Sequence, residues 1–202
     1  ELIRYDNSIF NFIQESSLDG FWYWDLENPE HEWMDNKFWS TLGYDPSTKR
    51  HLASEWQDII NQDDLKIAYK NFTKHCIDPS HPYDQEVRYT HKNGNTVWIR
   101  CKGMAIRNES GEAIRMLGAH TDITKLKEEE IESKKDLTEF VKAHKECFNN
   151  DFKSGHITGS AWLLNPAGDK VLLTYHRKLD IWCQLGGHAD GVSNVLQVSL
   201  TE

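Results

Sequence analysis

The sequence has few cysteines, and they form no recognisable arrangement. Cys76, Cys101, Cys147 and Cys183 lie far apart among 202 residues and include no Cys-x-x-Cys pair. Neither a disulfide framework nor a structural zinc site is therefore expected, and buried free thiols are predicted instead.

Long apolar runs and basic clusters are also lacking. No run approaches the roughly 18 apolar residues of a membrane span, and the N-terminus has no basic segment followed by an apolar stretch. We therefore expect a cytoplasmic location and no membrane partner. The 23 basic residues are outnumbered by 32 acidic ones, which gives a net charge of -9. Because phosphate binding relies on clustered Lys and Arg, no nucleic-acid partner is expected.

The composition is that of a folded protein, with 38% hydrophobic and 27% charged residues. The length fits one large domain or two small ones. Residues 1–15 carry a loosely helical apolar pattern, which predicts an N-terminal helix. We expect this helix, over Leu2 to Ile13, to pair two copies of the chain as a homodimer.

The next hundred residues alternate between strand and helix patterns. Aromatic residues 21–26 and residues 31–34 flank the turn residues Asn28 and Pro29, which predicts a hairpin. Short helices are expected over 35–44 and 54–60, and a longer one is expected to begin at a cap on Asp63 or Asp64. Period-two segments at 85–91, 96–106 and 112–123 predict a three-stranded meander. The fold class expected is α+β, an antiparallel sheet with helices on one face.

Several spaced motifs in residues 16–124 resemble the PAS domains, in particular those of bacterial sensor kinases and cyclic-dinucleotide enzymes. The matching segments are GFWYWD at 20–25, FWSTLGY at 38–44, the helix start at 63–64, EVRY at 86–89, GNTVWI at 94–99 and DIT at 122–124. The resemblance implies five antiparallel strands around a small cavity. It also implies that the domain senses a small ligand or a partner and passes the signal to an output domain.

The ligand itself stays open. Candidate pocket residues are Trp22, Trp24, Trp39, Leu42, Trp56, Ile60, Trp98 and Met104, since aromatic side chains line apolar sites. The alternative is that these rings fill the core. Residues 36–39 lack the cysteine with which light-sensing relatives capture flavin, so only noncovalent flavin is compatible. Haem would need a histidine such as His75, His81 or His120, and no spacing singles one out.

Residues Asp122, Ile123 and Thr124 are the predicted signal exit, followed by a charged connector helix over 125–135. Its apolar residues do not recur as a sustained coiled coil requires. A capping box begins at Ser133, so two helices meeting there and one continuous helix both fit.

Residues 136–202 resemble the N-terminal part of the Nudix hydrolases, which cleave nucleoside diphosphate derivatives. The matching segments are GHITGSA at 155–161, LLTYHRKL at 172–179 and WCQLGGHADG at 182–191. The resemblance implies part of an α/β/α sandwich, incomplete because the chain stops early in a helix. Gly186 and Gly187 are expected to serve a tight backbone turn.

In the Nudix family, glutamates of one helix hold Mg²⁺. Counted from Gly187, the first glutamate position holds Ser193, the arginine position holds Thr201, and Glu202 alone matches. One carboxylate is too few for Mg²⁺, so Mg²⁺ is expected only if the box is completed, and this chain is expected to be inactive.

Three hypotheses follow. The first is a PAS module that binds a small ligand or partner and regulates an attached domain. The second is a PAS-regulated Nudix hydrolase whose natural chain continues past Glu202, and the third is a non-catalytic dimerisation element.

Overall fold

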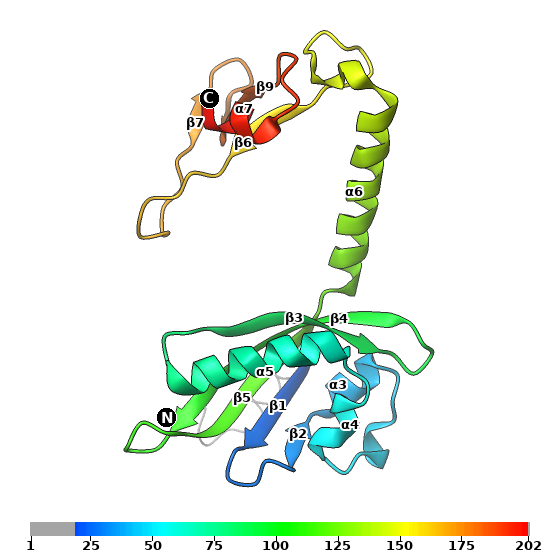
Figure 1. Ribbon diagram of the computed structural model, residues 1–202, viewed down its shortest axis with the longest axis vertical. Helices are drawn as coiled ribbons and strands as arrows, with labels where there is room; N and C mark the ends of the chain where they lie inside the picture. Colours follow the sequence, from blue (N-terminus) through cyan, green and yellow to red (C-terminus); the bar gives the residue numbers. More distant parts are fainter. Residues whose placement is uncertain (1–18, 202) are drawn as a thin grey trace. The chain divides into compact units, whose positions relative to one another are not determined.

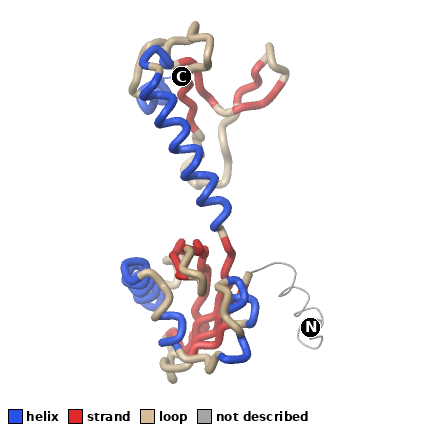
Figure 2. The backbone as a smooth tube through the Cα atoms, turned by 90° about the vertical axis from the view of Figure 1, so that its right-hand side faces the viewer, coloured by secondary structure: helices blue, strands red, loops and turns tan. Residues whose placement is uncertain are grey.

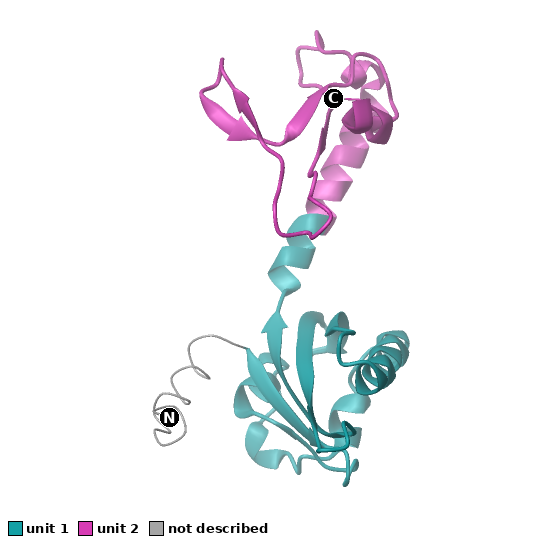
Figure 3. Cartoon of the chain, turned by 90° about the vertical axis from the view of Figure 1, so that its left-hand side faces the viewer, with its two compact units in different colours: residues 1–130 teal, residues 131–202 magenta. Residues whose placement is uncertain are grey.

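The computed structural model describes residues 19–201, which form two compact units divided between Glu130 and Ile131 (Figure 3). The expected N-terminal helix over residues 1–15, its dimer contact and Glu202 lie outside the described residues. Between Asp19 and Thr201, no helix is long and apolar enough to cross a membrane.

The first unit is built on a five-stranded antiparallel sheet. Its strands are β1 (Gly20–Asp25), β2 (Glu32–Met34), β3 (Tyr83–Thr90), β4 (Thr96–Arg107) and β5 (Ala113–Asp122). They lie in the order β2-β1-β5-β4-β3, so the two sequence-distant hairpins meet where β1 pairs with β5. Gly94 and Gly111 turn the chain between the last strands with positive φ angles of 91° and 85°, which glycine adopts without strain. The predicted antiparallel sheet is confirmed.

Four helical segments connect β2 to β3. They are α3 (Asn36–Thr41), the 3-10 helix η1 (Pro46–Thr48), α4 (Ala53–Gln57) and α5 (Gln62–Ile77). The longest, α5, packs on β3 and β4 and lies to one side of the strands in two views (Figures 1 and 2). Its N-cap is Asn61, whose side chain accepts hydrogen bonds from the backbone of Asp63 and Asp64. The predicted cap at Asp63 or Asp64 is therefore wrong, because both aspartates stand in the first helical turn.

The core of this unit lies between the sheet and its helices. Phe38, Trp39 and Leu42 come from α3 and its C-cap, and they are at most 1% exposed. They pack with inward residues of the sheet such as Ile99 and Met116. Asp35 caps α3 by accepting a hydrogen bond from the Phe38 backbone N–H, which fixes where this apolar face begins.

Trp22 lies against a strip of sheet that has no side chains. A Cβ added at Gly103 would come within 2.7 Å of the indole ring, and one added at Gly118 within 2.5 Å. The two glycines face each other across β4 and β5. Real Cβ atoms do not approach so closely, so the position of the indole depends on both glycines.

Helix α6 runs without a break from Thr124 to Ala143. Ser133 lies inside it, so the alternative of two helices meeting at Ser133 is wrong. The connector helix expected to end at 135 extends about two turns further, to Ala143. None of its residues is buried, and Leu126, Ile131 and Leu137 are each more than half exposed.

The second unit contains short elements after α6. They are the 3-10 helix η2 (Lys145–Phe148), strands β6 (Thr158–Ala161), β7 (Thr174–His176), β8 (Ile181–Cys183) and β9 (Leu185–His188), and helix α7 (Val195–Thr201). The strands form two separate antiparallel pairs, β6 with β9 and β7 with β8. Strands β6 and β7 lie within the segments 155–161 and 172–179 that resemble the Nudix family. Most large apolar side chains of this unit are exposed, including Trp162 and Trp182, each 67% exposed.

Candidate ligand-binding cavity

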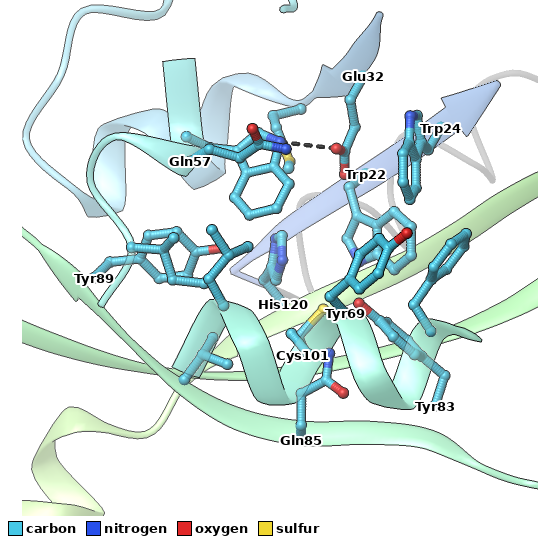
Figure 4. A pocket seen from close by; sticks show the side chains of 17 residues that line it. Trp22, Trp24, Glu32, Gln57, Tyr69, Tyr83, Gln85, Tyr89, Cys101 and His120 are labelled. Atoms are coloured by element: carbon cyan, nitrogen blue, oxygen red, sulfur yellow. Dashed lines mark hydrogen bonds between the residues drawn. The ribbon is translucent and has the colours of Figure 1, made fainter. Parts of the chain in front are cut away.

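The first unit has a cavity of about 70 Å³, partly open to solvent, between the sheet, α4 and α5 (Figure 4). Its wall is mostly apolar. Aromatic rings come from every side: Trp22, Trp24, Trp56, Tyr69, Phe72, Tyr83 and Tyr89. Aliphatic side chains fill the gaps between them: Met34, Ile60, Leu65, Ala68 and Val87. Cavities for drug-sized ligands span roughly 300–1,000 Å³, so this one suits a much smaller molecule.

Among the described residues, Glu32 is the only carboxyl side chain that lines the cavity, and no Lys or Arg lines it. It lies on β2, is 4% exposed, and its Oε2 accepts a hydrogen bond of 2.8 Å from Trp56 Nε1. Between residues 19 and 201 it forms no ion pair. Burial raises the pKa of Glu32 from 4.5 to about 8, against the smaller opposing effect of the Trp56 hydrogen bond.

His120 enters the cavity wall from β5 and is 2% exposed. Its Nδ1 is buried and has no hydrogen-bond partner among the described residues. Its ring lies 4.6 Å from the Phe38 ring and 6.4 Å from the Trp22 ring, between centroids. Burial lowers the pKa of His120 from 6.5 to about 3, so the imidazole is neutral at physiological pH. An unpaired buried nitrogen is costly unless a ligand or a water meets it.

The remaining polar groups on the wall are neutral as well. Burial raises the pKa of the Tyr83 and Tyr89 hydroxyls and of the Cys101 thiol. Gln85 accepts a hydrogen bond from Asn71 on α5. Gln57 completes the set.

Four of the eight expected pocket residues meet at this cavity, namely Trp22, Trp24, Trp56 and Ile60. Trp39 and Leu42 are buried in the core but are not part of the cavity wall. Trp98 points to the opposite side of β4 from Val97 and Ile99, and Met104 is 57% exposed. Strand alternation explains both positions, since neighbouring side chains of a strand face opposite ways.

Glu32 was not among the expected pocket residues, although the sequence carries a signal for it. Glu32 and Met34 flank Trp33 on β2, and they are buried while Trp33 is 41% exposed. Period-two alternation therefore turns Glu32 inward together with Met34.

The two other candidate haem histidines lie outside the cavity wall. His75 Nδ1 lies 2.6 Å from the His81 carbonyl oxygen, and its Nε2 accepts from the Ala105 backbone N–H at 3.1 Å. Both ring nitrogens of His75 are thereby occupied, so it has none left for iron. Of the three candidate histidines, only His120 combines a place at the cavity with a buried ring nitrogen that has no partner within residues 19–201.

The predicted signal exit joins the sheet to the start of α6. Ile123 is buried and its N–H donates to the Trp98 carbonyl, while the Trp98 N–H donates to Thr124 Oγ1 at 2.9 Å. Asp122 Oδ1 accepts from the Thr124 N–H. Lys127, one turn on, pairs with Glu86 of β3 at 2.8 Å and lies 5.8 Å from the Trp98 ring centroid.

In the second unit, Gly186 and Gly187 lie in β9, opposite Ser160 and Gly159 of β6. A Cβ at Gly186 would come within 2.6 Å of the Gly159 carbonyl oxygen, so this glycine serves close strand packing. The tight turn follows at Asp190 and Gly191, which have positive φ angles. Ser193 precedes α7 and Thr201 ends it. Across residues 19–201, no group of three or more His, Cys, Asp or Glu side chains could hold a metal ion.

Comparison with known proteins identifies the first unit. Residues 31–120 match the family model described as the PAS fold, so this part of the chain is a PAS domain. No curated protein matches the sequence.

Among solved structures, one with a TM-score above 0.5 has the same fold. A sensory box histidine kinase/response regulator from Burkholderia thailandensis E264 has 24% sequence identity and a TM-score of 0.57, and the match covers 66% of this chain and 98% of that one. A PAS domain from Colwellia psychrerythraea has 17% identity, a TM-score of 0.47 and coverage of 62% and 99%. The N-terminal domain of a diguanylate cyclase with PAS/PAC sensor from Marinobacter aquaeolei has 19% identity, a TM-score of 0.45 and coverage of 52% and 94%.

Proposed function

We propose that the PAS domain is a signal-sensing module, which binds a small molecule in its cavity and regulates an attached domain through α6. The observation that carries this proposal is the cavity, where the buried Nδ1 of His120 has no partner between residues 19 and 201. A ligand that meets such a group recovers the free energy lost on its burial.

A short covalent and hydrogen-bonded path leads from the cavity to α6. Cys101 and His120, which both line the cavity, face each other across β4 and β5. Two residues beyond His120 the chain reaches Asp122, and Ile123 and Thr124 exchange hydrogen bonds with Trp98. A shift of β5 against β4 would therefore reach the first turn of α6 directly.

Filling the cavity tests this function without knowledge of the ligand. Ala68 lines the cavity from α5, and Ala68→Leu places extra methyl groups inside it as a stand-in for a ligand. We expect hydrogen exchange at residues 124–130 to change in this variant, while the exposed control Ala143→Leu leaves it as in the wild type. Unchanged exchange in a folded Ala68→Leu protein would contradict the proposal.

A second candidate function is suggested by the strand–turn–helix order of β9, the turn at Asp190 and α7, which is also the order of the Nudix box. In this reading the chain, extended past Glu202 by its own gene sequence, hydrolyses a nucleoside diphosphate derivative with Mg²⁺ under PAS control. Ser193 and Thr201 at two positions of the box count against it. The test is Mg²⁺-dependent hydrolysis by the extended protein, with loss of activity expected in Glu202→Gln.

Pairing of two copies through the N-terminal segment stays a prediction. Sedimentation of the chain with and without residues 2–13 tests it, and an unchanged dimer would count against that segment.

A further inference from the structure

The cavity combines one buried carboxyl group with a surround of aromatic rings. Glu32 is 4% exposed, and the hydrogen bond from Trp56 Nε1 to its Oε2 is the one hydrogen bond of its side chain found among residues 19–201. No Lys or Arg belongs to the cavity wall. A carboxylate without a cation is costly inside a protein, so the site favours a ligand that supplies the missing positive charge.

The rings around Glu32 suit the same kind of ligand. Trp22 and Trp24 line the cavity from β1, Tyr83 from β3 and Trp56 from α4 (Figure 4). Aromatic faces attract cations through the ring quadrupole, most strongly for Trp and when the cation is desolvated.

We infer that the cavity binds a small organic ammonium ion, with Glu32 as its counter-ion and the neighbouring indole and phenol rings as its cage. This inference rests on the proposed sensing function and names the class of ligand. The cavity of about 70 Å³ holds a cation with on the order of five non-hydrogen atoms, since one water needs roughly 10–15 Å³ of such volume.

The other titratable groups facing the cavity do not oppose a cation. His120 on β5 is neutral because burial lowers its pKa to about 3. Tyr83 and Tyr89 on β3 and Cys101 on β4 are neutral because burial raises their pKa values. His120 in its neutral form also has one ring nitrogen that accepts a hydrogen bond, which an ammonium N–H can donate.

Binding is expected to depend on pH through Glu32. The pKa of Glu32 is about 8, so the carboxylate form is the minor one at pH 7 and the major one above pH 8. The cation binds the carboxylate form, and its affinity therefore rises with pH and levels off above pH 8. Below pH 7 the affinity falls roughly tenfold for each pH unit.

Calorimetric titration of the full chain with two matched probes tests the inference. The probes are tert-butylammonium, which stays protonated between pH 6 and 9, and tert-butanol, a neutral molecule of the same shape. At pH 8.5 we expect tert-butylammonium to bind at least tenfold more tightly than tert-butanol. Glu32→Gln keeps an acceptor for Trp56 and should remove this difference, whereas Glu27→Gln, an exposed control, should leave it in place.

A second variant covers the case in which Glu32→Gln unfolds. Trp24→Leu removes one ring from the cage and should weaken tert-butylammonium binding several-fold while affecting tert-butanol less. Equal binding of the two probes, or tighter binding of tert-butanol, overturns the ammonium inference and leaves small-molecule sensing intact. If neither probe binds, the ammonium inference is also wrong, and the Ala68→Leu exchange experiment decides on sensing separately.

Discussion

At the scale of single residues, Glu32 and His120 make the stability of the folded domain depend on pH in opposite directions. The folded state prefers the protonated acid at Glu32, because its pKa rises from 4.5 to about 8. It prefers the neutral base at His120, whose pKa falls from 6.5 to about 3. Stability from Glu32 is lost as pH rises from 4.5 to 8, and stability from His120 is lost as pH falls from 6.5 to 3. Between pH 4.5 and 6.5 the two effects oppose each other.

Glu32→Gln should therefore abolish the loss of stability that the wild type undergoes as pH rises from 4.5 to 8. We compare the free energy of unfolding of Glu32→Gln with that of the wild type. The difference in favour of the variant is expected to increase by on the order of 4 kcal/mol between pH 5 and pH 8, at about 1.4 kcal/mol per pKa unit. Urea unfolding at several pH values measures this difference. The control Glu27→Gln should follow the wild type, and parallel curves for Glu32→Gln and the wild type would show that Glu32 ionises normally.

His120→Phe should act on the acid side. Phe fills the place of the imidazole beside Phe38 and cannot take up a proton. As pH falls from 6.5 to 3, the free energy of unfolding of the variant relative to that of the wild type is expected to increase by on the order of 4 kcal/mol. Thermal unfolding at matched pH values provides the measurement, with the exposed His31→Gln as control. No relative gain at low pH would mean that His120 takes up a proton in the folded protein as readily as in the unfolded one.

At the scale of elements, α5 is joined to β3 by a pair that the sequence did not reveal. Asp64 in the first turn of α5 accepts hydrogen bonds from the backbone N–H, Nε and Nη2 of Arg88 at 2.7–2.8 Å. The Arg88 hydrogen bonds keep the pKa of Asp64 below its usual value.

Asp64→Asn should destabilise the domain by about 1–3 kcal/mol at neutral pH, because it replaces charge-assisted bonds and leaves Arg88 half-satisfied. The adjacent Asp63→Asn is the matched control, since Asp63 is 81% exposed and, among residues 19–201, forms an ion pair only with Lys66. Denaturant unfolding compares the two, and the deficit of Asp64→Asn should shrink as pH falls and Asp64 becomes protonated. Equal stability of both variants would show that the pair does not hold α5 to the sheet.

The first turn of α6 is held by Lys127, which is paired with Glu86 and Glu130 and packs near Trp98. Lys127→Ala should speed hydrogen exchange in residues 124–130, because the helix start loses its contacts with β3 and β4. Lys125→Ala is the control, since Lys125 is 89% exposed and 3.8 Å from Glu129. Equal exchange in the two variants would show that the Lys127 contacts do not hold the start of α6.

The elements show which features a sequence reveals. Asn93-Gly94 and Ser110-Gly111 mark hairpins by local backbone chemistry, so β3, β4 and β5 were predictable. The cavity was predictable only in part. Trp98 and Trp22 have similar surroundings in the sequence, and only the register of β4 and β1 determines on which face of the sheet each side chain lies. The continuity of α6 at Ser133 was open, since a capping box and a helix interior contain the same residue types.

At the scale of the whole molecule, the two units bury very different amounts of apolar surface. The first contains most of the buried large side chains, whereas in the second Cys147, Ala189 and Val198 are the buried apolar residues among those described. Its strands form two-stranded pairs, which are marginal in water.

Hydrogen exchange of the full chain should therefore divide between the units. Amides of Val87, Ile99 and Met116 in the five-stranded sheet are expected to exchange by global unfolding, and those of Tyr175 and Ile181 by local opening at a much lower cost. Mass-spectrometric exchange of peptides from β3 to β5 and from β7 to β8 compares them. Similar protection in both regions would show that the second unit is stabilised by more than its own buried residues.

The glycines beneath Trp22 have one more consequence, which concerns how such a site can diversify. A Cβ added at Gly103 or Gly118 would come within 2.7 Å of the Trp22 indole, and neither glycine belongs to the cavity wall. A methyl group at either position would displace the ring, which lines the cavity, and so change the volume of the cavity. The volume of the cavity thus depends partly on positions that no ligand contacts. Related domains can therefore differ in the size of ligand they bind while every residue that lines the cavity stays the same.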